Sequence, residues 1–302
     1  MAGRRWGDPM SDLFRLDPGW HYDVPMETYL ADEGLSSSAF QDFKRSAHYY
    51  RFRQNRERAP SKAMTNGTAF HIAVLEPEEF DRLYVIAGQC SAHKKNGDRC
   101  TNPGSRIYRD RAFCGVRGHH PKPYFIEEAG GPEIVEQDDR DAMVIARNNL
   151  HQHQHIMQYF KGVGASEVTG IWVDEASGVR CKIRLDREIE RATHHVDLKY
   201  TASADVRAFK RQTWSMGWMH RSAFYRRGMK ALGHDATASI IIASESEPAH
   251  DCNLFILDEA QVEVIGQGID RHLTEFAACQ QSGDWPGYDQ EPVHLTLEDW
   301  QL

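Results

Sequence analysis

Apolar and polar residues alternate along two segments near the middle of the chain. The pattern covers residues 179–186 (VRCKIRLD) and residues 196–201 (VDLKYT). A period of two is typical of half-buried strands, whose successive side chains point to opposite faces. We therefore predict two strands, which can pair as a hairpin that turns across residues 187–195.

Helical patterns precede these strands. Residues 35–54 begin with a serine cluster that suits a helix N-cap. Residues 66–76 read as a helix that Asn66 or Thr68 caps and that Pro77 ends.

The rest of the chain adds further elements. Helical patterns cover 132–160, 204–232 and 258–279, and short apolar runs at 238–243 and 253–257 read as strands. This order of elements predicts an α/β fold in which a mixed central sheet is flanked by helices.

Composition limits the classes of function. The chain has 302 residues, with 36 Lys and Arg against 44 Asp and Glu, which gives a net charge of −8. This balance disfavours a protein that coats nucleic acid, but an enzyme that acts on DNA needs only a local basic channel. No apolar run approaches the roughly 20 residues of a membrane-spanning helix, and the opening MAGRRWGDPM lacks the apolar core of a secretion signal. We expect a cytoplasmic protein that does not bind membranes.

Candidate chemistry lies on the polar faces of the two predicted strands. Asp197 and Lys199 are two residues apart and share a face, and Asp186 ends the polar face of the other strand. Two carboxylates and an ammonium suit phosphodiester hydrolysis. The carboxylates hold Mg²⁺ or Mn²⁺, the metal activates water, and the lysine stabilises developing negative charge. The alternative is a solvated polar face with a weak salt bridge, since a short motif is only a hypothesis.

Three further segments and an extension of the second predicted strand make the pattern more specific. They are 35–50 (LSSSAFQDFKRSAHYY), 66–80 (NGTAFHIAVLEPEEF), 196–204 (VDLKYTASA) and 279–288 (CQQSGDWPGY). With residues 179–187, their order and spacing resemble RecE-type, exonuclease VIII-like enzymes of the RecB-like branch of the PD-(D/E)xK nuclease superfamily. The resemblance covers about residues 21–86 and 165–290.

The resemblance implies an active site. Its metal ligands would be His71, Asp186, Asp197 and the carbonyl of Leu198, and its catalytic residues Asp186, Asp197 and Lys199. It also implies Glu76 as a supporting carboxylate and Mg²⁺ as the cofactor, with Mn²⁺ able to substitute. Without the resemblance, a lone histidine such as His71 on an amphipathic helix is more often a packed core residue than a metal ligand.

The resemblance also implies a reaction and partners. Such a bacterial or phage-encoded enzyme would degrade linear double-stranded DNA from its 5′ end and leave a 3′ strand for a single-strand annealing protein during recombination. It would form a ring-shaped homo-oligomer. Two alternatives stay open, namely another PD-(D/E)xK nuclease, such as a single-strand exonuclease or an endonuclease, and a DNA-binding adaptor without catalysis.

One position departs from the resemblance. The related proteins carry glutamine four residues before a tyrosine, whereas this chain has Arg221 before Tyr225. A stripe at helical spacing contains Arg207, Arg211, Trp214, Trp218, Arg221 and Tyr225. We expect Arg207, Arg211, Arg221 and Tyr225 to contact DNA, because guanidinium groups suit phosphate geometry. The alternative is a helix with a mixed surface and two aromatic core contacts.

Residues 88–123 differ from their surroundings. They contain Cys90, Cys100, Cys114, His119 and His120 but few aliphatic residues. Three cysteines and a histidine are a common set for structural Zn²⁺, and His119 is our fourth ligand. His120 and His93 are alternatives for that position, and an iron–sulfur cluster or a disordered loop are alternatives for the whole segment.

These patterns divide the chain into four parts. We expect a flexible leader over residues 1–20 and the N-terminal part of a nuclease core over 21–87. An inserted zinc-binding module would follow over 88–123, and the remainder of the core over 124–302.

Overall fold

The computed structural model describes most of the chain. The described residues are 15–54, 56, 61–86, 133–160, 164–189, 193–288 and 291–292, together with 90, 92–98, 100–102, 104, 106–108, 111–114 and 116.

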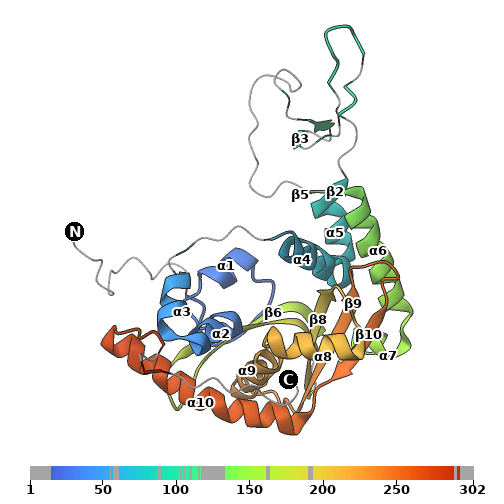
Figure 1. The fold of residues 1–302 in the computed structure, drawn as a ribbon. Helices are drawn as coiled ribbons and strands as arrows, with labels where there is room; N and C mark the ends of the chain where they lie inside the picture. Colours follow the sequence, from blue (N-terminus) through green and yellow to red (C-terminus); the bar gives the residue numbers. More distant parts are fainter. Residues whose placement is uncertain are drawn as a thin grey trace, which may run out of the picture.

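A six-stranded sheet forms the centre of the molecule, in the order β1-β6-β7-β8-β9-β10 (Figure 1). Its strands are β1 (Gly19–His21), β6 (Gly164–Val173), β7 (Arg180–Ile189), β8 (His194–Thr201), β9 (Ala238–Glu245) and β10 (Cys252–Ile256). Only the β8–β9 pair is parallel, so the sheet is mixed. The α/β fold with a mixed, helix-flanked sheet is therefore confirmed.

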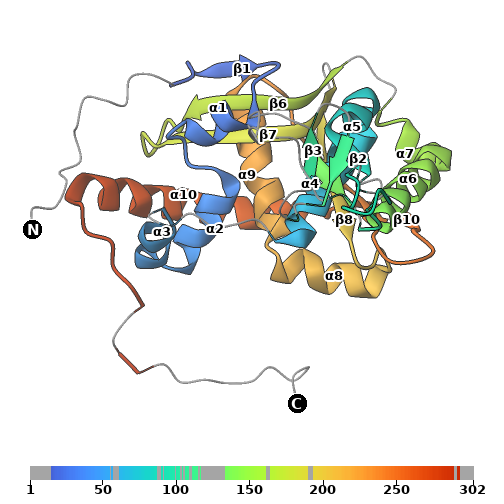
Figure 2. The same cartoon turned by 90° about the horizontal axis from the view of Figure 1, so that it is seen from above.

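Helices cover both faces of this sheet (Figures 1 and 2). The first layer includes α2 (Ser37–Arg45), α9 (Trp218–Ala231) and α10 (Glu259–Ser282), and the second includes α4 (Lys62–Leu75) and α6 (Gln137–Gln152). In β9, Ile241 packs into the first layer, whereas Ile240 and Ile242 pack into the second. Burial on both faces explains the continuous apolar run in this strand.

Shorter elements complete the described structure. They are α1 (Met26–Ala31), α3 (Ala47–Gln54), α5 (Pro77–Leu83), α7 (Gln154–Met157) and α8 (Val206–Ser215), with the pairs β2 (Tyr84–Ile86) and β5 (Glu133–Val135), and β3 (Arg106–Tyr108) and β4 (Arg111–Phe113). Among the described residues, no helix combines the length and the apolar character that crossing a membrane requires.

The predicted hairpin is confirmed, since β7 pairs antiparallel with β8. The predicted turn across residues 187–195 is too long, because β7 extends to Ile189 and β8 begins at His194. The predicted cap of the second helix is wrong. The side chain of Ser61 caps α4 by accepting a hydrogen bond from the Met64 amide, so the helix begins before Asn66. Pro77 starts α5 as its first residue, where the missing N–H costs nothing.

The single helix predicted over 204–232 is also wrong. The structure has α8 and α9 instead, and Gly217 between them adopts a left-handed conformation with φ of 68°. Glycine takes this conformation without a steric penalty. The break divides the predicted stripe, so Trp214 is exposed on α8 whereas Trp218 is buried in α9.

Part of the predicted leader is ordered. Residues 1–14 lie outside the described residues, but Gly19–His21 form β1, which pairs with β6. The Trp20 indole also donates a hydrogen bond to the Leu232 carbonyl at 3.2 Å.

Two buried charged residues attach α1 and its following loop to β7. Asp32 accepts hydrogen bonds from the Gly34 amide and from Arg180. Burial alone would raise the pKa of Asp32, but the hydrogen bonds from Arg180 and Gly34 hold it below its usual value. Lys182 donates to the carbonyls of Tyr29 at 2.7 Å and Asp32 at 2.6 Å, and burial lowers the pKa of Lys182 to about 8. These contacts fix one wall of the cleft described below.

We predict that Asp32→Ala lowers the free energy of unfolding by about 3 kcal/mol, because it leaves Arg180, whose side chain is only 10% exposed, without its partner. A carboxyl with a lowered folded-state pKa stabilises the fold above its unfolded pKa, and this contribution is lost as the pH falls. The difference from the wild type should therefore shrink below pH 3.8, the usual Asp value. Urea denaturation at several pH values measures the difference in the free energy of unfolding. The substitution Glu27→Ala, at an exposed position, is the control. An equal effect of both substitutions would contradict the role of Asp32.

Candidate metal centre

Two carboxylates face each other across β6 and β7. Ser166 pairs with Arg187 and Val168 pairs with Leu185, so the antiparallel register puts Glu167 opposite Asp186. Like charges in directly opposite positions destabilise a sheet. The pair therefore requires nearby cations.

The backbone at Glu167 is unusual for a strand. Its φ of 55° lies in the left-handed region, which costs a residue with a side chain about 1–3 kcal/mol. Backbone strain of this kind clusters at ligand sites, where the surrounding structure maintains it. The strain therefore marks Glu167 as a position to test for function.

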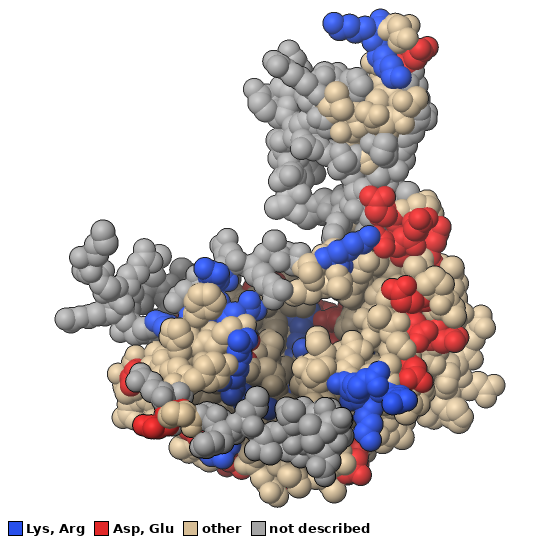
Figure 3. All heavy atoms as spheres, in the orientation of Figure 1, with Lys and Arg blue, Asp and Glu red and all other residues tan. Residues whose placement is uncertain are grey.

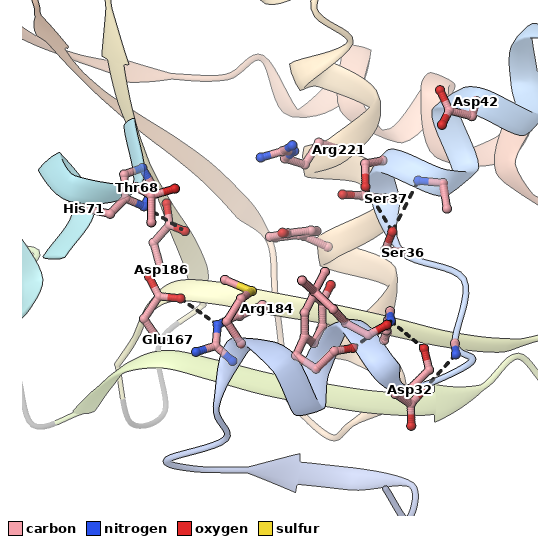
Figure 4. Close-up of a pocket in the computed structure, with 18 of the residues that line it drawn as sticks. Asp32, Ser36, Ser37, Asp42, Thr68, His71, Glu167, Arg184, Asp186 and Arg221 are labelled. Carbon is pink, nitrogen blue, oxygen red and sulfur yellow. Dashed lines mark hydrogen bonds and ion pairs between the residues drawn. The ribbon is translucent and has the colours of Figure 1, made fainter. Parts of the chain in front are cut away.

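Helix α4 adds a nitrogen ligand to the two carboxylates. His71 Nδ1 lies 3.7 Å from Asp186 Oδ1, and one ligand atom from each of His71, Glu167 and Asp186 lies within 4.8 Å of the others (Figure 4). Neighbouring ligand atoms of a Mg²⁺ ion are roughly 3 Å apart and opposite ones roughly 4 Å. The group thus fits a divalent ion after a small contraction. The two carboxylates suit both Mg²⁺ and Mn²⁺, and the imidazole nitrogen favours Mn²⁺ over Mg²⁺.

Arg184 compensates part of the negative charge. Its Nε donates to Glu167 at 2.7 Å, and its Nη1 donates to the Val24 carbonyl at 2.9 Å. Burial and the facing charge of Asp186 nevertheless raise the pKa of Glu167. A bound cation would favour the ionised form of this carboxyl.

A backbone contact orients Asp186. Its Oδ2 accepts a hydrogen bond from the Leu198 amide at 2.6 Å, so Oδ1 is left on the side of His71. The β7–β8 hairpin thereby links the metal-binding group to the peptide between Asp197 and Lys199.

Asp197 and Lys199 form a buried ion pair on β8. Their side chains are 3% and 11% exposed, and Lys199 also donates to the Leu198 carbonyl at 3.3 Å. Burial alone would raise the pKa of Asp197, but Lys199 and Arg221 hold it below its usual value. Asp197 is therefore ionised at neutral pH and fixes the position of the Lys199 ammonium.

An open cleft of about 660 Å³ gives access to His71, Glu167 and Asp186, whereas Asp197 and Lys199 are not among the residues that line it. Its lining includes Ser36 before α2, Thr68 on α4 and Arg184 on β7. The space-filling view shows this hollow, with Lys and Arg side chains gathered on both sides of it over α2–α3 and over α8 (Figure 3). On α8 these are Arg207, Lys210 and Arg211, all exposed. A negatively charged protein thus has a basic surface beside the candidate site.

The predicted site residues fall into two groups around this cleft. His71, Asp186, Glu76, Arg221 and Tyr225 line it. Asp197 is not part of the three-residue ligand group. It lies on the adjacent strand, paired with Lys199.

The predicted DNA-binding residues do not form one helical face. Arg221 and Tyr225 line the cleft from α9, and burial raises the pKa of Tyr225 to about 12. Arg207 and Arg211 lie on α8, outside the lining.

The predicted zinc ligands also come together in part. The sulfurs of Cys90, Cys100 and Cys114 lie within 4.8 Å of one another. His119 and His120 lie outside the described residues. Described His93 is not part of this group.

Glu167 and its partner Arg184 were not predicted as site residues from the sequence. The segment GASEVTGIWV becomes β6, but its alternation is weak and gave no strand prediction. A strand at this position places Glu167 opposite Asp186 only through its register with β7, which the structure supplies. The left-handed backbone has no signal in the sequence.

Comparison with known proteins supports the fold. The family model described as a PDDEXK-like domain of unknown function (DUF3799) matches residues 36–292. The crystal structure of a protein from Eubacterium rectale, provisionally named an exonuclease, has a similar fold. It gives a TM-score of 0.52 at 13% sequence identity and covers 91% of this chain and 97% of that protein.

More distant comparisons add little. The structure of the protein SSO0001 gives a TM-score of 0.27 at 14% identity, covering 47% of this chain and 68% of that one, which is too low to support an argument. No curated protein matches the chain.

We predict that Glu167→Gln, which keeps the shape of the side chain but removes its charge, weakens Mn²⁺ binding at least about 10-fold. Isothermal titration calorimetry on the folded variant measures the affinity. Glu175→Gln, on the exposed turn between β6 and β7, is the matched control. Unchanged Mn²⁺ affinity in Glu167→Gln would exclude Glu167 from the metal centre.

Proposed function

This chain belongs to the DUF3799 family of PDDEXK-like domains, and on that premise we propose that it is a metal-dependent nuclease that degrades linear double-stranded DNA from its ends. The observation that carries the proposal is the His71–Glu167–Asp186 group, which a peptide hydrogen bond connects to the Asp197–Lys199 pair. A binding adaptor has no need for this combination of metal donors and a buried ammonium.

The chain's own residues would divide the chemistry between them. His71, Glu167 and Asp186 would hold Mg²⁺, with Mn²⁺ able to substitute, and the ion supplies a Lewis acid that activates water and neutralises charge on the scissile phosphate. Asp197 and the Leu198 carbonyl are the further ligands that the family resemblance implies. They adjoin the group because the Leu198 amide donates to Asp186.

Lys199 would act on charge that develops in the transition state. The Asp197 carboxylate and the Leu198 carbonyl hold its ammonium in place before substrate binds. A preorganised positive charge in a site with little water stabilises a developing oxyanion at little cost of reorganisation. Glu76, exposed at the end of α4, would support the site from the wall of the cleft.

DNA would enter between the two basic sides of the cleft. Arg207 and Arg211 would contact phosphates on the outer side, and Arg221 and Tyr225 would contact the strand near the metal centre. Arg221 stands where related enzymes have glutamine and places a positive charge there. Its Nη1 lies 3.9 Å from Oδ1 of Asp197. A guanidinium binds phosphate in a forked geometry.

The finer parts of the proposal come from the RecE-type resemblance. They are digestion of the 5′-ended strand, a 3′ single strand that passes to an annealing protein during recombination, a ring-shaped homo-oligomer and a cytoplasmic location in bacterial or phage-infected cells. The fold likeness to a protein provisionally named an exonuclease supports action at DNA ends.

We predict that Asp186→Asn and Lys199→Gln each reduce the rate of DNA cleavage at least about 100-fold. Asparagine can still accept the Leu198 hydrogen bond, so Asp186→Asn should fold normally. Thermal melts check the fold, because Lys199→Gln removes one member of a buried pair. Exposed Asp235→Asn and Lys230→Gln are matched controls. Full activity of a folded variant would contradict the proposed site.

The substrate is tested with three DNA forms in Mg²⁺. An end-labelled blunt duplex should be degraded, and a covalently closed circle of the same sequence should persist. Cleavage of the circle would instead indicate an endonuclease, and preference for single strands a single-strand exonuclease. Placing the label at the 5′ or the 3′ end determines polarity, and sedimentation determines the oligomeric state. A well-folded wild type without any activity would favour the adaptor.

We predict that Arg207→Ala with Arg211→Ala weakens DNA binding and lowers the slope of log affinity against log salt by about 2, because each phosphate contact contributes about one unit. Fluorescence anisotropy in Ca²⁺ measures binding, provided that this ion does not support cleavage. Arg271→Ala, an exposed arginine on α10, should leave the slope unchanged. An unchanged slope in the double variant would show that these two arginines of α8 do not contact the DNA.

A further inference from the structure

Residues 90–102 fold as a short hairpin outside the six-stranded sheet. The Cys90 amide donates to the Asn102 carbonyl at 3.0 Å, and the Cys100 amide donates to the Ala92 carbonyl at 2.8 Å. Gly97 closes the turn with φ of 91°, a conformation that favours glycine. Cys90 and Cys100 are therefore held diagonally across one small hairpin.

A second hairpin brings the third cysteine to the first two. Strands β3 and β4 pair antiparallel, and Cys114 follows β4 directly. The Sγ atoms of Cys100 and Cys114 are 3.9 Å apart, and the Cys114 amide donates to the sulfur of Cys90 at 3.4 Å. Three sulfurs from two hairpins thus converge on one point.

A disulfide does not explain this cluster. The 3.9 Å between the sulfurs of Cys100 and Cys114 is far longer than the S–S bond of about 2.05 Å. Hydrophobic packing is a weak alternative. The buried members of the local core are Cys90, Cys100 and Phe113, with Ala92 and Cys114 packed beside them. Among the described residues of this segment, these few apolar groups bury too little surface to order two hairpins.

We propose that Cys90, Cys100 and Cys114 bind a structural Zn²⁺ ion as thiolates, at a site separate from the candidate catalytic centre. Tetrahedral zinc with Zn–S bonds of about 2.3 Å separates its sulfur ligands by about 3.8 Å, and the structure has 3.9 Å between Cys100 and Cys114. The amide of Cys114 stabilises thiolate charge on Cys90. The ion supplies the folding energy that the small core lacks.

The fourth ligand stays a prediction from the sequence. The described residues contribute three sulfurs, and His119 or His120 would complete a Cys₃His set.

The module is joined to the core at one place. The chain leaves the core after β2 and returns at β5, and these two strands pair in parallel. In Figure 1 the hairpins stand beyond β2 and β5, away from the six-stranded sheet. Loss of zinc should therefore unfold the hairpins and leave the core intact.

The test is metal analysis of the full-length protein purified without added zinc and dialysed against EDTA. We expect about one Zn²⁺ per chain. Cys100→Ser and Cys114→Ser should each lose the ion, whereas Cys279→Ser on α10 should retain it. Exchange with Co²⁺ should give the near-ultraviolet absorption of thiolate-to-cobalt charge transfer, which reports sulfur ligands independently of activity.

Two further measurements separate the outcomes. Asp186→Asn should keep the zinc, since it alters only the candidate catalytic centre, so failure of the nuclease proposal would leave this result unchanged. The melting transition of the core in Cys100→Ser should stay close to that of the wild type. Iron with visible absorbance, wild-type protein without metal, or zinc retained in both cysteine variants would each overturn the proposal.

Discussion

Repulsion between two carboxylates organises the candidate site. Glu167 and Asp186 occupy opposite positions on neighbouring strands, where like charges cost stability. Arg184 neutralises part of Glu167, and the Leu198 amide stabilises one oxygen of Asp186. The remaining negative charge faces His71 and the open cleft. Because Arg184 compensates only part of the charge of the two carboxylates, the pair can receive a further cation from solvent.

The same hairpin links metal binding to the buried ion pair. Strand β8 directs Val196 and Leu198 into the core below α4 and α6, so its register cannot slip without exposing them. Asp197 and Lys199 are then fixed on the other side of the strand. Removing either charge alone would leave the other buried without a partner. The stability of the strand and the position of the ammonium therefore depend on the same packing.

The sequence predicted those features that depend on local periodicity. The alternation in 179–186 and 196–201 predicted the hairpin, and the resemblance predicted that His71 and Asp186 would meet. Glu167 was not predicted, because its role depends on cross-strand register and on a backbone conformation with no sequence signal. The α8–α9 break was missed because Gly217 is a single residue within an otherwise helical pattern. Its left-handed conformation is set by tertiary context.

The net charge of the chain does not describe the surface around the cleft. The net charge of −8 coexists with Lys and Arg on both sides of the cleft, and Figure 3 shows acidic side chains gathered over α5 and α6 instead. Separation of charge over the surface can steer a polyanion toward the cleft and repel it elsewhere. Because repulsion between DNA and the acidic face acts in the same direction as attraction to the basic one, a negatively charged protein can orient a duplex more sharply than a uniformly basic protein.

The two proposed metal sites differ in donor chemistry. Oxygen and imidazole donors at His71, Glu167 and Asp186 suit hard, exchangeable ions, whereas the three sulfurs suit a softer ion held permanently. Zinc binds most nitrogen and oxygen sites more tightly than Mg²⁺ does, so affinity alone would not keep it out of the cleft. A buried sulfur site in the same chain does not solve this problem, since it saturates with one ion. Selection between Mg²⁺ and Zn²⁺ at the cleft must therefore depend on metal availability and on the number of oxygen ligands. Glu167 adds an oxygen ligand that was not expected from the sequence, so it matters for the choice of metal.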